Sequence, residues 1–143
     1  MVGSQKKVIL FIDDDEDDRM LFRDLFKECS PEIEFRWAAD GEQALDYLIK
    51  RPGSAEDTPS VILLDLNMPK INGREVLKQI RNHKELSAIP VVVLSNSMNK
   101  EEALEIYHLG ANSFTRKPAG YKELREFVST FYKYWFEYSM LNL

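Results

Sequence analysis

The sequence predicts a doubly wound α/β protein, a three-layer sandwich in which helices cover both faces of a parallel sheet. The strongest observation is a set of continuous apolar runs at residues 8–12, 61–64 and 91–94, which are too short for membrane spans. Such runs suit strands that are buried on both faces of a parallel sheet. The second observation is that helical signals separate the strand signals, the alternation that short right-handed crossovers require.

The first two strand–helix units come before the central strand. A strand over residues 8–12 runs into an acidic segment, and apolar residues at helical spacing then predict a helix through 22–29. Alternating apolar and polar residues over 33–37 predict a strand near the edge of the sheet. The apolar spacing over 44–49 predicts the second helix.

The second half of the chain continues the alternation, so that five strand signals alternate with five helix signals. Residues 51–60 form a polar loop with proline and glycine, longer than most connections of this kind. The loop leads to the central strand, which ends at Asp65. The further elements are expected at residues 76–80 (helix), 91–94 (strand), 103–110 (helix), 112–115 (strand) and from Tyr121 onward (helix).

Composition places the chain among ordinary globular domains. It has 143 residues, 44% hydrophobic and 30% charged, so one domain can bury a full core. The net charge of −5 argues against nucleic acid as the main partner. No run has membrane length and the N-terminus lacks a signal-peptide layout, so no membrane partner is expected. Cys29 is alone, which fits a reducing cytoplasm, and residues 1–6 are expected to be a disordered leader.

Chemically distinctive residues follow four of the expected strands. Asp13 and Asp14 follow the first, Asp65 the third, Ser95 the fourth, and Lys117 comes shortly after the fifth. The carboxyl ends of the strands of a doubly wound sheet share one edge, so these side chains are expected to meet there. Each also has a plainer explanation: an acidic helix start, an aspartate that caps a turn, a serine that caps a helix, and a solvated lysine.

Together these residues predict a phosphoryl-transfer site. Asp13, Asp14 and Asp65 would bring about three negative charges together, which raises their pKa values or requires a cation, and an all-oxygen ligand set favours Mg²⁺. Lys117 adds a positive charge suited to an oxyanion such as phosphate, and Ser95 offers a hydroxyl donor. A carboxylate in such a site can itself be the nucleophile, which would leave an acyl phosphate on Asp65.

The set of motifs resembles the receiver domain of two-component response regulators. The resemblance covers residues 7–137, with 138–143 as an extension of the last helix, and it implies a flavodoxin-like (βα)5 fold with parallel strand order 2-1-3-4-5. The intervals of thirty residues from Asp65 to Ser95 and fifty-two from Asp65 to Lys117 also match the family. The motifs are Ile12-Asp13-Asp14, Asp40-Gly41 with Ala44-Leu45, Leu64-Asp65-Leu66-Asn67-Met68-Pro69 with Gly73, Ser95, and Lys117-Pro118.

The resemblance implies a Mg²⁺-dependent phosphoacceptor rather than an enzyme with a separate substrate. Asp65 would accept phosphate from a sensor histidine kinase or a histidine phosphotransfer protein. Asp14 would bind Mg²⁺ directly and Asp13 through water, while Asp65 and the Asn67 carbonyl would complete the protein ligands. The long loop and the lack of an output domain resemble the small stand-alone regulators that serve cyanobacterial phytochromes and related histidine kinases.

The resemblance also assigns the phosphate contacts and the switch. Lys117 and the Ser95 hydroxyl would bind phosphate oxygens, assisted by backbone N–H groups near Asn67 and Asn96. On phosphorylation Ser95 would move toward the phosphate and Phe114 would rotate inward. Ser95 and Phe114 stand where many members have threonine and tyrosine, and neither change removes the function. Lys117-Pro118 resembles the family's cis peptide.

Other functions of the same fold fit the residues less well. A Mg²⁺-dependent aspartyl-phosphate phosphatase usually carries a second acid two residues after its nucleophile, where this chain has Asn67, which is no acid or base. A scaffold that is not phosphorylated is disfavoured because the acidic and phosphate-site positions are intact. A flavin-binding protein of similar topology would lack the three converging aspartates.

The last expected helix carries more aromatic residues than one sheet face can cover, and such residues often mark an interface. We expect either a homodimer or partner contact, or a tail that folds back on its own domain. His83 and His108 are expected to be solvated, and Trp37 to be partly exposed. The interface candidates are Tyr132, Tyr134, Trp135, Phe136 and Tyr138.

Overall fold

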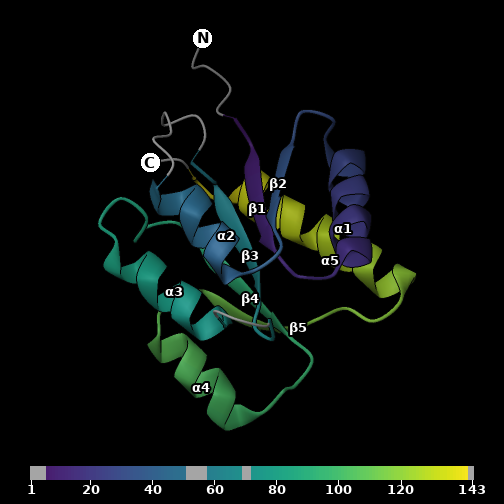
Figure 1. Cartoon of the computed structure of the whole chain (residues 1–143). Coiled ribbons are helices and arrows are strands. Elements are labelled where there is room, and N and C mark those ends of the chain that lie inside the picture. Colours follow the sequence, from purple (N-terminus) through teal and green to yellow (C-terminus); the bar gives the residue numbers. More distant parts are fainter. Residues whose placement is uncertain (1–5, 51–57, 69–71, 142–143) are drawn as a thin grey trace.

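The computed structural model describes residues 6–50, 58–68 and 72–141. Within these ranges the chain forms one five-stranded parallel sheet in the order β2-β1-β3-β4-β5, which confirms the predicted fold class and strand order (Figure 1). The strands are β1 (Val8–Ile12), β2 (Glu34–Ala38), β3 (Val61–Asp65), β4 (Val91–Ser95) and β5 (Ser113–Arg116).

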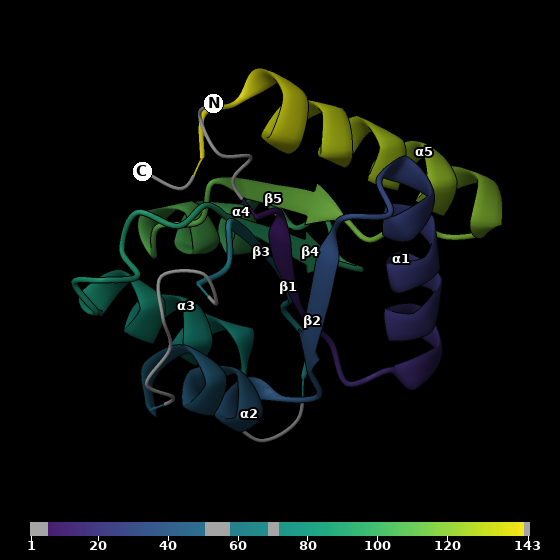
Figure 2. The ribbon, with the colours of Figure 1, turned by 90° about the horizontal axis from the view of Figure 1, so that it is seen from above.

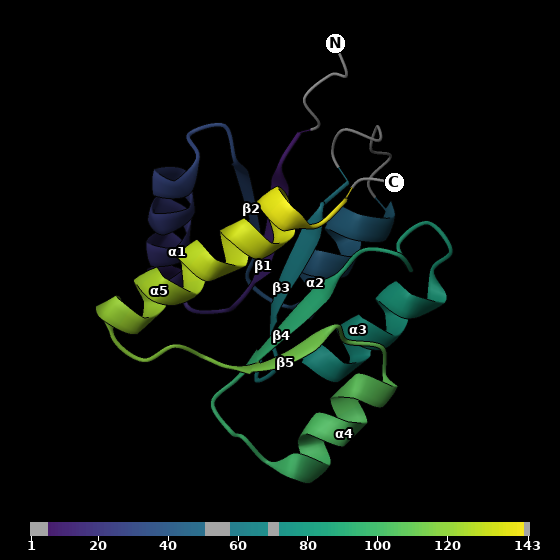
Figure 3. The same ribbon diagram turned by 180° about the vertical axis from the view of Figure 1, so that it is seen from behind.

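Helices cover both faces of this sheet, as Figure 2 shows from above. α1 and α5 lie side by side on one face, and α2, α3 and α4 lie on the other (Figures 2 and 3). The helices are α1 (Glu16–Cys29), α2 (Gly41–Leu45), α3 (Gly73–Asn82), α4 (Lys100–His108) and α5 (Tyr121–Tyr132); the π-helical segments η1 (Asp46–Lys50) and η3 (Lys133–Tyr138) continue α2 and α5.

The strands separate two hydrophobic clusters because successive side chains point to opposite faces. Leu10 and Ile12 of β1 belong to the cluster under α2, α3 and α4, whereas Ile9 and Phe11 belong to the cluster under α1 and α5. All residues of β1, β3 and β4 are buried, as continuous apolar runs predict for central strands covered on both faces.

Polar side chains cap four of the helices. Asp15, Asp40, Asn72 and Asn99 each accept hydrogen bonds from backbone N–H groups in the first turn of the helix that follows. α3 therefore begins at Gly73, before the apolar spacing that marks it in the sequence. Part of the acidic segment after β1 therefore forms a helix start, which is one of the alternative explanations given in the sequence analysis.

Several expected boundaries differ slightly from the structure. β2 and β5 lie one residue later than expected, and the second half of the second helix is π-helical. The expected cis peptide at Lys117-Pro118 is wrong, because the described part of the chain contains no cis peptide bond and trans is the intrinsically favoured form. Residues 1–5 of the expected leader and most of the 51–60 loop lie outside the described residues. None of the described helices has the length and hydropathy that crossing a bilayer requires.

Candidate functional site

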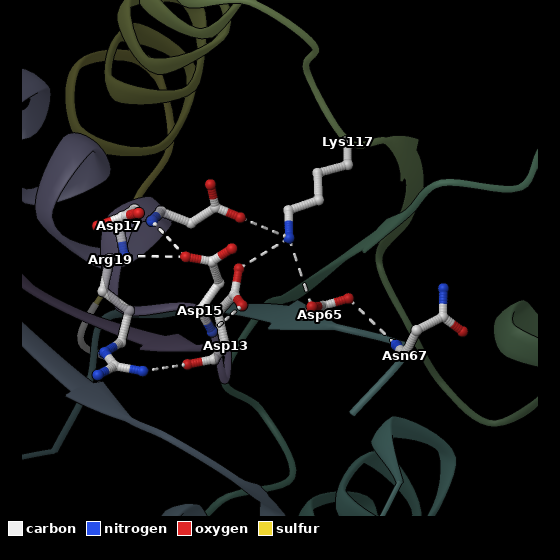
Figure 4. A network of polar contacts seen from close by, with 8 residues as sticks. Asp13, Asp15, Asp17, Arg19, Asp65, Asn67 and Lys117 are labelled. Atoms are coloured by element: carbon white, nitrogen blue, oxygen red, sulfur yellow. Dashed lines mark hydrogen bonds and ion pairs between the residues drawn. The ribbon is translucent and has the colours of Figure 1, made fainter. Parts of the chain in front are cut away.

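The carboxyl ends of the central strands meet at one edge of the sheet. Asp13 directly follows β1, Asp65 ends β3 and Ser95 ends β4. The backbone N–H of Lys117, just after β5, donates to the Ser95 carbonyl at 2.8 Å, which fixes the end of β5 against that of β4. The predicted convergence of these segments is therefore present in the structure, and Figure 4 shows it for Asp13, Asp65 and Lys117.

Three carboxylates form the centre of the site. Asp13, Asp14 and Asp65 each offer one oxygen atom such that all three oxygens lie within 4.8 Å of one another. Asp13 and Asp65 are buried, with 0% and 4% exposure, whereas Asp14 is exposed to solvent. Backbone N–H groups hold the buried pair: Asp15 donates to Asp13 Oδ1 at 2.9 Å, and Asn67 donates to Asp65 Oδ1 at 3.1 Å.

Lys117 supplies the positive charge. Its Nζ lies 2.9 Å from Asp13 Oδ2, 2.9 Å from Asp18 Oδ2 and 3.4 Å from Asp65 Oδ2 (Figure 4). The Lys117 side chain is only 14% exposed, so solvent screens these ion pairs weakly. Asp18 is a contact that the sequence prediction missed, although it lies in the acidic segment and in the first turn of α1.

Burial and charge set the protonation of these groups. Burial raises the pKa of Asp13 to about 6, against the opposing hydrogen bonds from the Asp15 N–H and from Lys117. Burial also raises the pKa of Asp65, although Lys117 and the Asn67 N–H favour its charged form. For Lys117, burial favours the neutral amine, but hydrogen bonds to Asp18 and Asp13 and attraction to Asp65 outweigh it and raise its pKa.

The donor set fits a hard divalent cation. All of the clustered side-chain ligands are carboxylate oxygens, which Mg²⁺, Mn²⁺ and Ca²⁺ prefer, and two of them are buried with raised pKa values. A bound cation would offset the cost of burying these charges, because an opposite charge favours the ionised form of a carboxylate. The exposed Asp14 leaves one side of the cluster open to solvent.

The remaining predicted site residues surround this centre. Ser95 is fully buried, and its Oγ accepts a hydrogen bond from the Ser97 N–H at 3.1 Å. Asn67 and Asn96 are exposed, and the Asn67 side chain extends away from Asp65 in Figure 4. Phe114 is 8% exposed and belongs to the buried cluster under α3 and α4, so its ring already occupies the core.

Trp37 and Arg19 form a feature beside the site that the sequence did not reveal. Trp37 is 54% exposed, as expected, and the Arg19 guanidinium carbon lies 4.2 Å from the centroid of its ring. Arg19 also donates from Nη1 to the Asp13 carbonyl at 2.9 Å. The pair thus ties α1 to the edge strand β2, and only the three-dimensional structure reveals it because the two residues are distant in sequence.

The two histidines lie outside the site. His108 is exposed, as expected. His83 is only half-buried, but its Nδ1 is buried without a hydrogen-bond partner among the described residues, so the expectation that this residue is solvated is wrong for that atom. His83 is the C-cap residue of α3, and its backbone N–H donates to the Ile80 carbonyl at 3.3 Å.

The interface candidates of the last helix divide into packed and exposed residues. Tyr132 accepts a hydrogen bond from Lys7 Nζ at 2.7 Å, and Trp135 and Phe136 pack against the cluster under α1 and α5. In contrast, Tyr134 is 55% exposed and Tyr138 is 81% exposed. The helix therefore folds partly onto its own domain and leaves two tyrosines at the surface.

Comparison with known proteins supports the resemblance to response regulator receiver domains. The family model of the response regulator receiver domain matches residues 9–129. Response regulator Rcp1 of Synechocystis sp. is 36% identical over 133 residues, which are 92% of this chain and 90% of that protein. The probable methanogenesis regulatory protein FilR2 of Methanothrix harundinacea is 36% identical over 128 residues, 90% of this chain and 83% of that protein.

Solved structures of such regulators are also similar. The phosphorylated cyanobacterial phytochrome response regulator RcpA matches with a TM-score of 0.86 at 34% identity, covering 94% of this chain and 97% of that one. The Mn²⁺-bound form of Rcp1 matches with a TM-score of 0.82 at 35% identity, covering 94% and 98%. From its sequence, its fold and its acidic site, the chain belongs to the response regulator receiver domain family, whose members are phosphoacceptor signalling modules rather than true enzymes and act with histidine kinases.

Proposed function

We propose that Asp65 accepts a phosphoryl group, in a Mg²⁺-dependent reaction, from a sensor histidine kinase or a histidine phosphotransfer protein. The observation that carries the proposal is the meeting of Asp13, Asp14, Asp65 and Lys117 at one edge of the sheet. The similarity to the phosphorylated RcpA and to Mn²⁺-bound Rcp1 supports both the reaction and the need for a divalent cation.

In the proposed reaction one Asp65 carboxylate oxygen attacks the phosphorus of the donor phosphohistidine. A phosphorus–oxygen bond forms, the phosphorus–nitrogen bond breaks, and the histidine nitrogen leaves with the bond electrons and takes a proton from solvent. The backbone N–H of Asn67 holds Asp65 Oδ1 in place, so the nucleophile is oriented before the donor arrives. Asp13, Asp14, Asp65 and the Asn67 carbonyl would hold Mg²⁺, which neutralises charge on the transferring group when bound.

Lys117 would follow the negative charge during the transfer. Its flexible side chain now lies between Asp13, Asp18 and Asp65, and its raised pKa keeps it protonated. A phosphoryl oxygen on Asp65 would accept a hydrogen bond from this ammonium group. Ser95 and the backbone N–H groups near Asn67 and Asn96 would supply further donors, since Ser95 ends β4 and the two asparagines come shortly after strands that end at this edge.

The proposed conformational signal centres on Ser95 and Phe114. Ser95 would turn its hydroxyl toward the phosphoryl group, which requires it to leave the contacts that it makes in the present structure. The Phe114 ring is already buried, so an inward position of this ring is compatible with the present position of Ser95. The two parts of the switch therefore need not move together, and phosphorylation would act by favouring the conformation in which Ser95 contacts the phosphoryl group.

The competing phosphatase function lacks support at the same position. A second catalytic acid would stand at Asn67, whose amide cannot exchange a proton with substrate and whose side chain extends away from Asp65. A scaffold that is not phosphorylated would have no use for buried carboxylates, because burying their charge costs free energy.

Intact-mass measurement tests the proposal. The protein is incubated with Mg²⁺ and acetyl phosphate, and the wild type is expected to gain the mass of one phosphoryl group while Asp65→Asn gains none. Asp24→Asn, which alters an exposed carboxylate on α1, serves as the matched control and should label like the wild type. Equal labelling of the wild type and Asp65→Asn, or no labelling of either, would contradict the proposal.

We further propose that the exposed tyrosines of the last helix, Tyr134 and Tyr138, contribute to a homodimer. Their exposure beside the packed Trp135 and Phe136 leaves an aromatic surface on η3, and aromatic residues are enriched at interfaces. Size-exclusion chromatography with light scattering should give a dimer mass for the wild type and a monomer mass for Tyr134→Ser with Tyr138→Ser. A wild type that is monomeric at every concentration would refute this contact.

A further inference from the structure

The Ser95 hydroxyl is engaged on the side of α4. Ser95 Oγ accepts from the Ser97 N–H at 3.1 Å and lies 3.4 Å from Glu102 Oε1, to which it can donate. Among the described residues these are its hydrogen-bond partners, and Asp65 is not one of them. At 3.4 Å the contact with Glu102 is long for a hydroxyl–carboxylate hydrogen bond, so it is a weak bias rather than a lock.

Arg74 holds Glu102 in this place. Its Nη2 donates to Glu102 Oε2 at 2.8 Å, and its Nε donates to Glu105 Oε1 at 2.5 Å. The arginine thus comes from α3 and spans two carboxylates on α4, and it leaves the other oxygen of Glu102 facing Ser95. The charged contacts raise the pKa of Arg74, with the Glu105 hydrogen bond as the largest cause. The result is a continuous polar chain from α3 through α4 to the end of β4.

A serine hydroxyl carries one proton and can donate it to one acceptor at a time. In the proposed function the acceptor is a phosphoryl oxygen on Asp65, whereas in the present structure it is Glu102. We propose that Glu102, oriented by Arg74, is a positioning residue that competes with the phosphoryl group for the Ser95 hydroxyl and so opposes the phosphorylated conformation. The inference rests on the proposed function, because only a group bound at Asp65 gives Ser95 an alternative acceptor.

The consequence is measurable as a change in affinity for a phosphoryl mimic. Beryllium fluoride with Mg²⁺ forms a tetrahedral mimic of a phosphoryl group on a carboxylate, and calorimetry gives its dissociation constant. Replacing Glu102 with alanine removes the competing acceptor, so Glu102→Ala should bind beryllium fluoride about fivefold more tightly, the factor that one weak hydrogen bond supplies. Glu102→Gln keeps an acceptor oxygen toward Ser95 and should return part of the way to the wild-type value.

Glu105 provides a matched control on the same helix. It shares Arg74 with Glu102 but makes no contact with Ser95, so Glu105→Ala should bind beryllium fluoride within about twofold of the wild type. A second comparison separates the hydrogen bond from the general effect of negative charge. In a Ser95→Ala background there is no hydroxyl for which Glu102 and the phosphoryl mimic can compete, so Glu102→Ala should no longer tighten binding. A purely structural role of Glu102 would not depend on the Ser95 hydroxyl in this way.

Failure of the inference can be distinguished from failure of the proposed function. Wild-type protein that does not bind beryllium fluoride in the presence of Mg²⁺ would overturn the proposed function and the inference with it. Wild-type binding together with equal or weaker binding by Glu102→Ala would overturn the inference alone. An equal gain from Glu102→Ala in the wild-type and Ser95→Ala backgrounds would also overturn it, since the gain would then come from charge and not from competition for the hydroxyl.

Discussion

At the scale of single residues, one ammonium group balances the carboxylates of the site. Lys117 Nζ is within 3.4 Å of oxygens from Asp13, Asp18 and Asp65, and the Lys117 side chain is largely buried. Removing one partner of a buried charge cluster leaves the others unpaired, which costs more than the pairing itself contributes. Lys117 should therefore matter for stability as well as for chemistry.

Replacing Lys117 with alanine should lower the free energy of unfolding by about 3 kcal/mol in metal-free buffer near neutral pH. Part of this loss should return on adding Mg²⁺, because a cation among the carboxylates replaces the lost charge. The same variant should be phosphorylated by acetyl phosphate about a hundredfold more slowly. Urea unfolding with and without Mg²⁺ measures the first effect. Lys122→Ala, on the exposed face of α5, is the control, and a comparable loss there would contradict the assignment.

Asp13 should give the stability a distinct pH dependence. Burial raises its pKa to about 6 in the folded state, from an ordinary value of 3.8, so the folded state binds its proton more tightly than the unfolded state. The stability that this group contributes is therefore full below about pH 4 and is lost as the pH rises through about 6.

The variant Asp13→Asn isolates this pH dependence. The free energy of unfolding of the wild type relative to Asp13→Asn should be about 2 kcal/mol lower near pH 7.5 than near pH 4.5, so the wild type is relatively less stable at the higher pH, as measured by urea unfolding with EDTA. The exposed Asp24→Asn variant should show no such trend. A difference between wild type and Asp13→Asn that stays constant across this range would show that Asp13 is not held in a desolvated environment.

Much of the site could be predicted at this scale. Asp13, Asp65 and Ser95 stand directly at the ends of apolar runs, and parallel strands carry such residues to one edge. Asp18 and Arg19 could not be assigned, because their contacts depend on the rotation of α1 about its axis. The phase of a helix that follows a short loop is fixed by packing against the sheet and not by local residue type.

At the scale of elements, the start of α3 is packed tightly against the segment after Asp65. A Cβ on Gly73 would lie 2.9 Å from Leu66 Cα and 3.1 Å from the Asp65 carbonyl oxygen, both of them backbone atoms. The Gly73 N–H also donates to the Leu66 carbonyl at 3.4 Å. The absence of a side chain at Gly73 therefore allows the helix start to approach the end of β3.

Gly73→Ala should lower the free energy of unfolding by about 1 to 3 kcal/mol, because backbone must move to relieve the contact. The movement displaces the segment that carries Asn67, so phosphorylation of Asp65 by acetyl phosphate should slow as well. Lys78→Ala, on the exposed face of α3, should change neither quantity. Full labelling rate in Gly73→Ala would indicate that the position of this segment does not control the reaction.

At the amino ends of the strands, opposite the acidic site, Arg81 joins several segments by hydrogen bonds. Arg81 donates to the carbonyl oxygens of Gly110, Ser87 and Ile89 at 2.7, 3.2 and 2.9 Å, and to Asn112 Oδ1 at 2.9 Å. It thus ties the end of α3 to the segments that precede β4 and β5. Because acceptors from both segments meet at one guanidinium group, the arginine supports the amino edge of the sheet.

Arg81→Ala should lower the free energy of unfolding by about 2 to 4 kcal/mol and leave the labelling rate of the folded protein unchanged, since the anchor is far from Asp65 along the strands. The control is Arg125→Ala, which removes an exposed pair with Glu28 at 3.9 Å and should cost less than about 0.5 kcal/mol. Similar losses in the two variants would show that the Arg81 contacts are not specific.

The strands that are buried on both faces of the sheet could be predicted from the sequence. The runs that became β1, β3 and β4 are apolar throughout, so their burial on both faces is visible in the sequence. The π-helical segments η1 and η3 were not foreseen, because the apolar spacing of a short segment does not distinguish one helical hydrogen-bond pattern from another. The starts of α1 and α3 depend on the capping side chains Asp15 and Asn72.

At the scale of the whole molecule, the two faces of the sheet are covered by apolar side chains, whereas its carboxyl edge is charged. Two hydrophobic clusters fill the space between the sheet and its helices, whereas the carboxyl edge gathers carboxylates whose burial opposes their ionisation. A divalent cation or a phosphoryl group therefore binds where the buried carboxylates lower the stability of the unliganded fold. This arrangement couples the chemistry at Asp65 to the stability of the fold.

Of all the carboxylates of the chain, Asp65 is the one that we propose to become the acyl phosphate. The most direct measurement is to label the protein with acetyl phosphate and Mg²⁺, reduce the acyl phosphate with borohydride, and locate the modified residue by peptide mass spectrometry. We expect modification at Asp65 alone, and loss of the phosphoryl group when hydroxylamine is added before reduction. A phosphoryl group that resists hydroxylamine, or that maps to a histidine, a serine or another carboxylate, would contradict it.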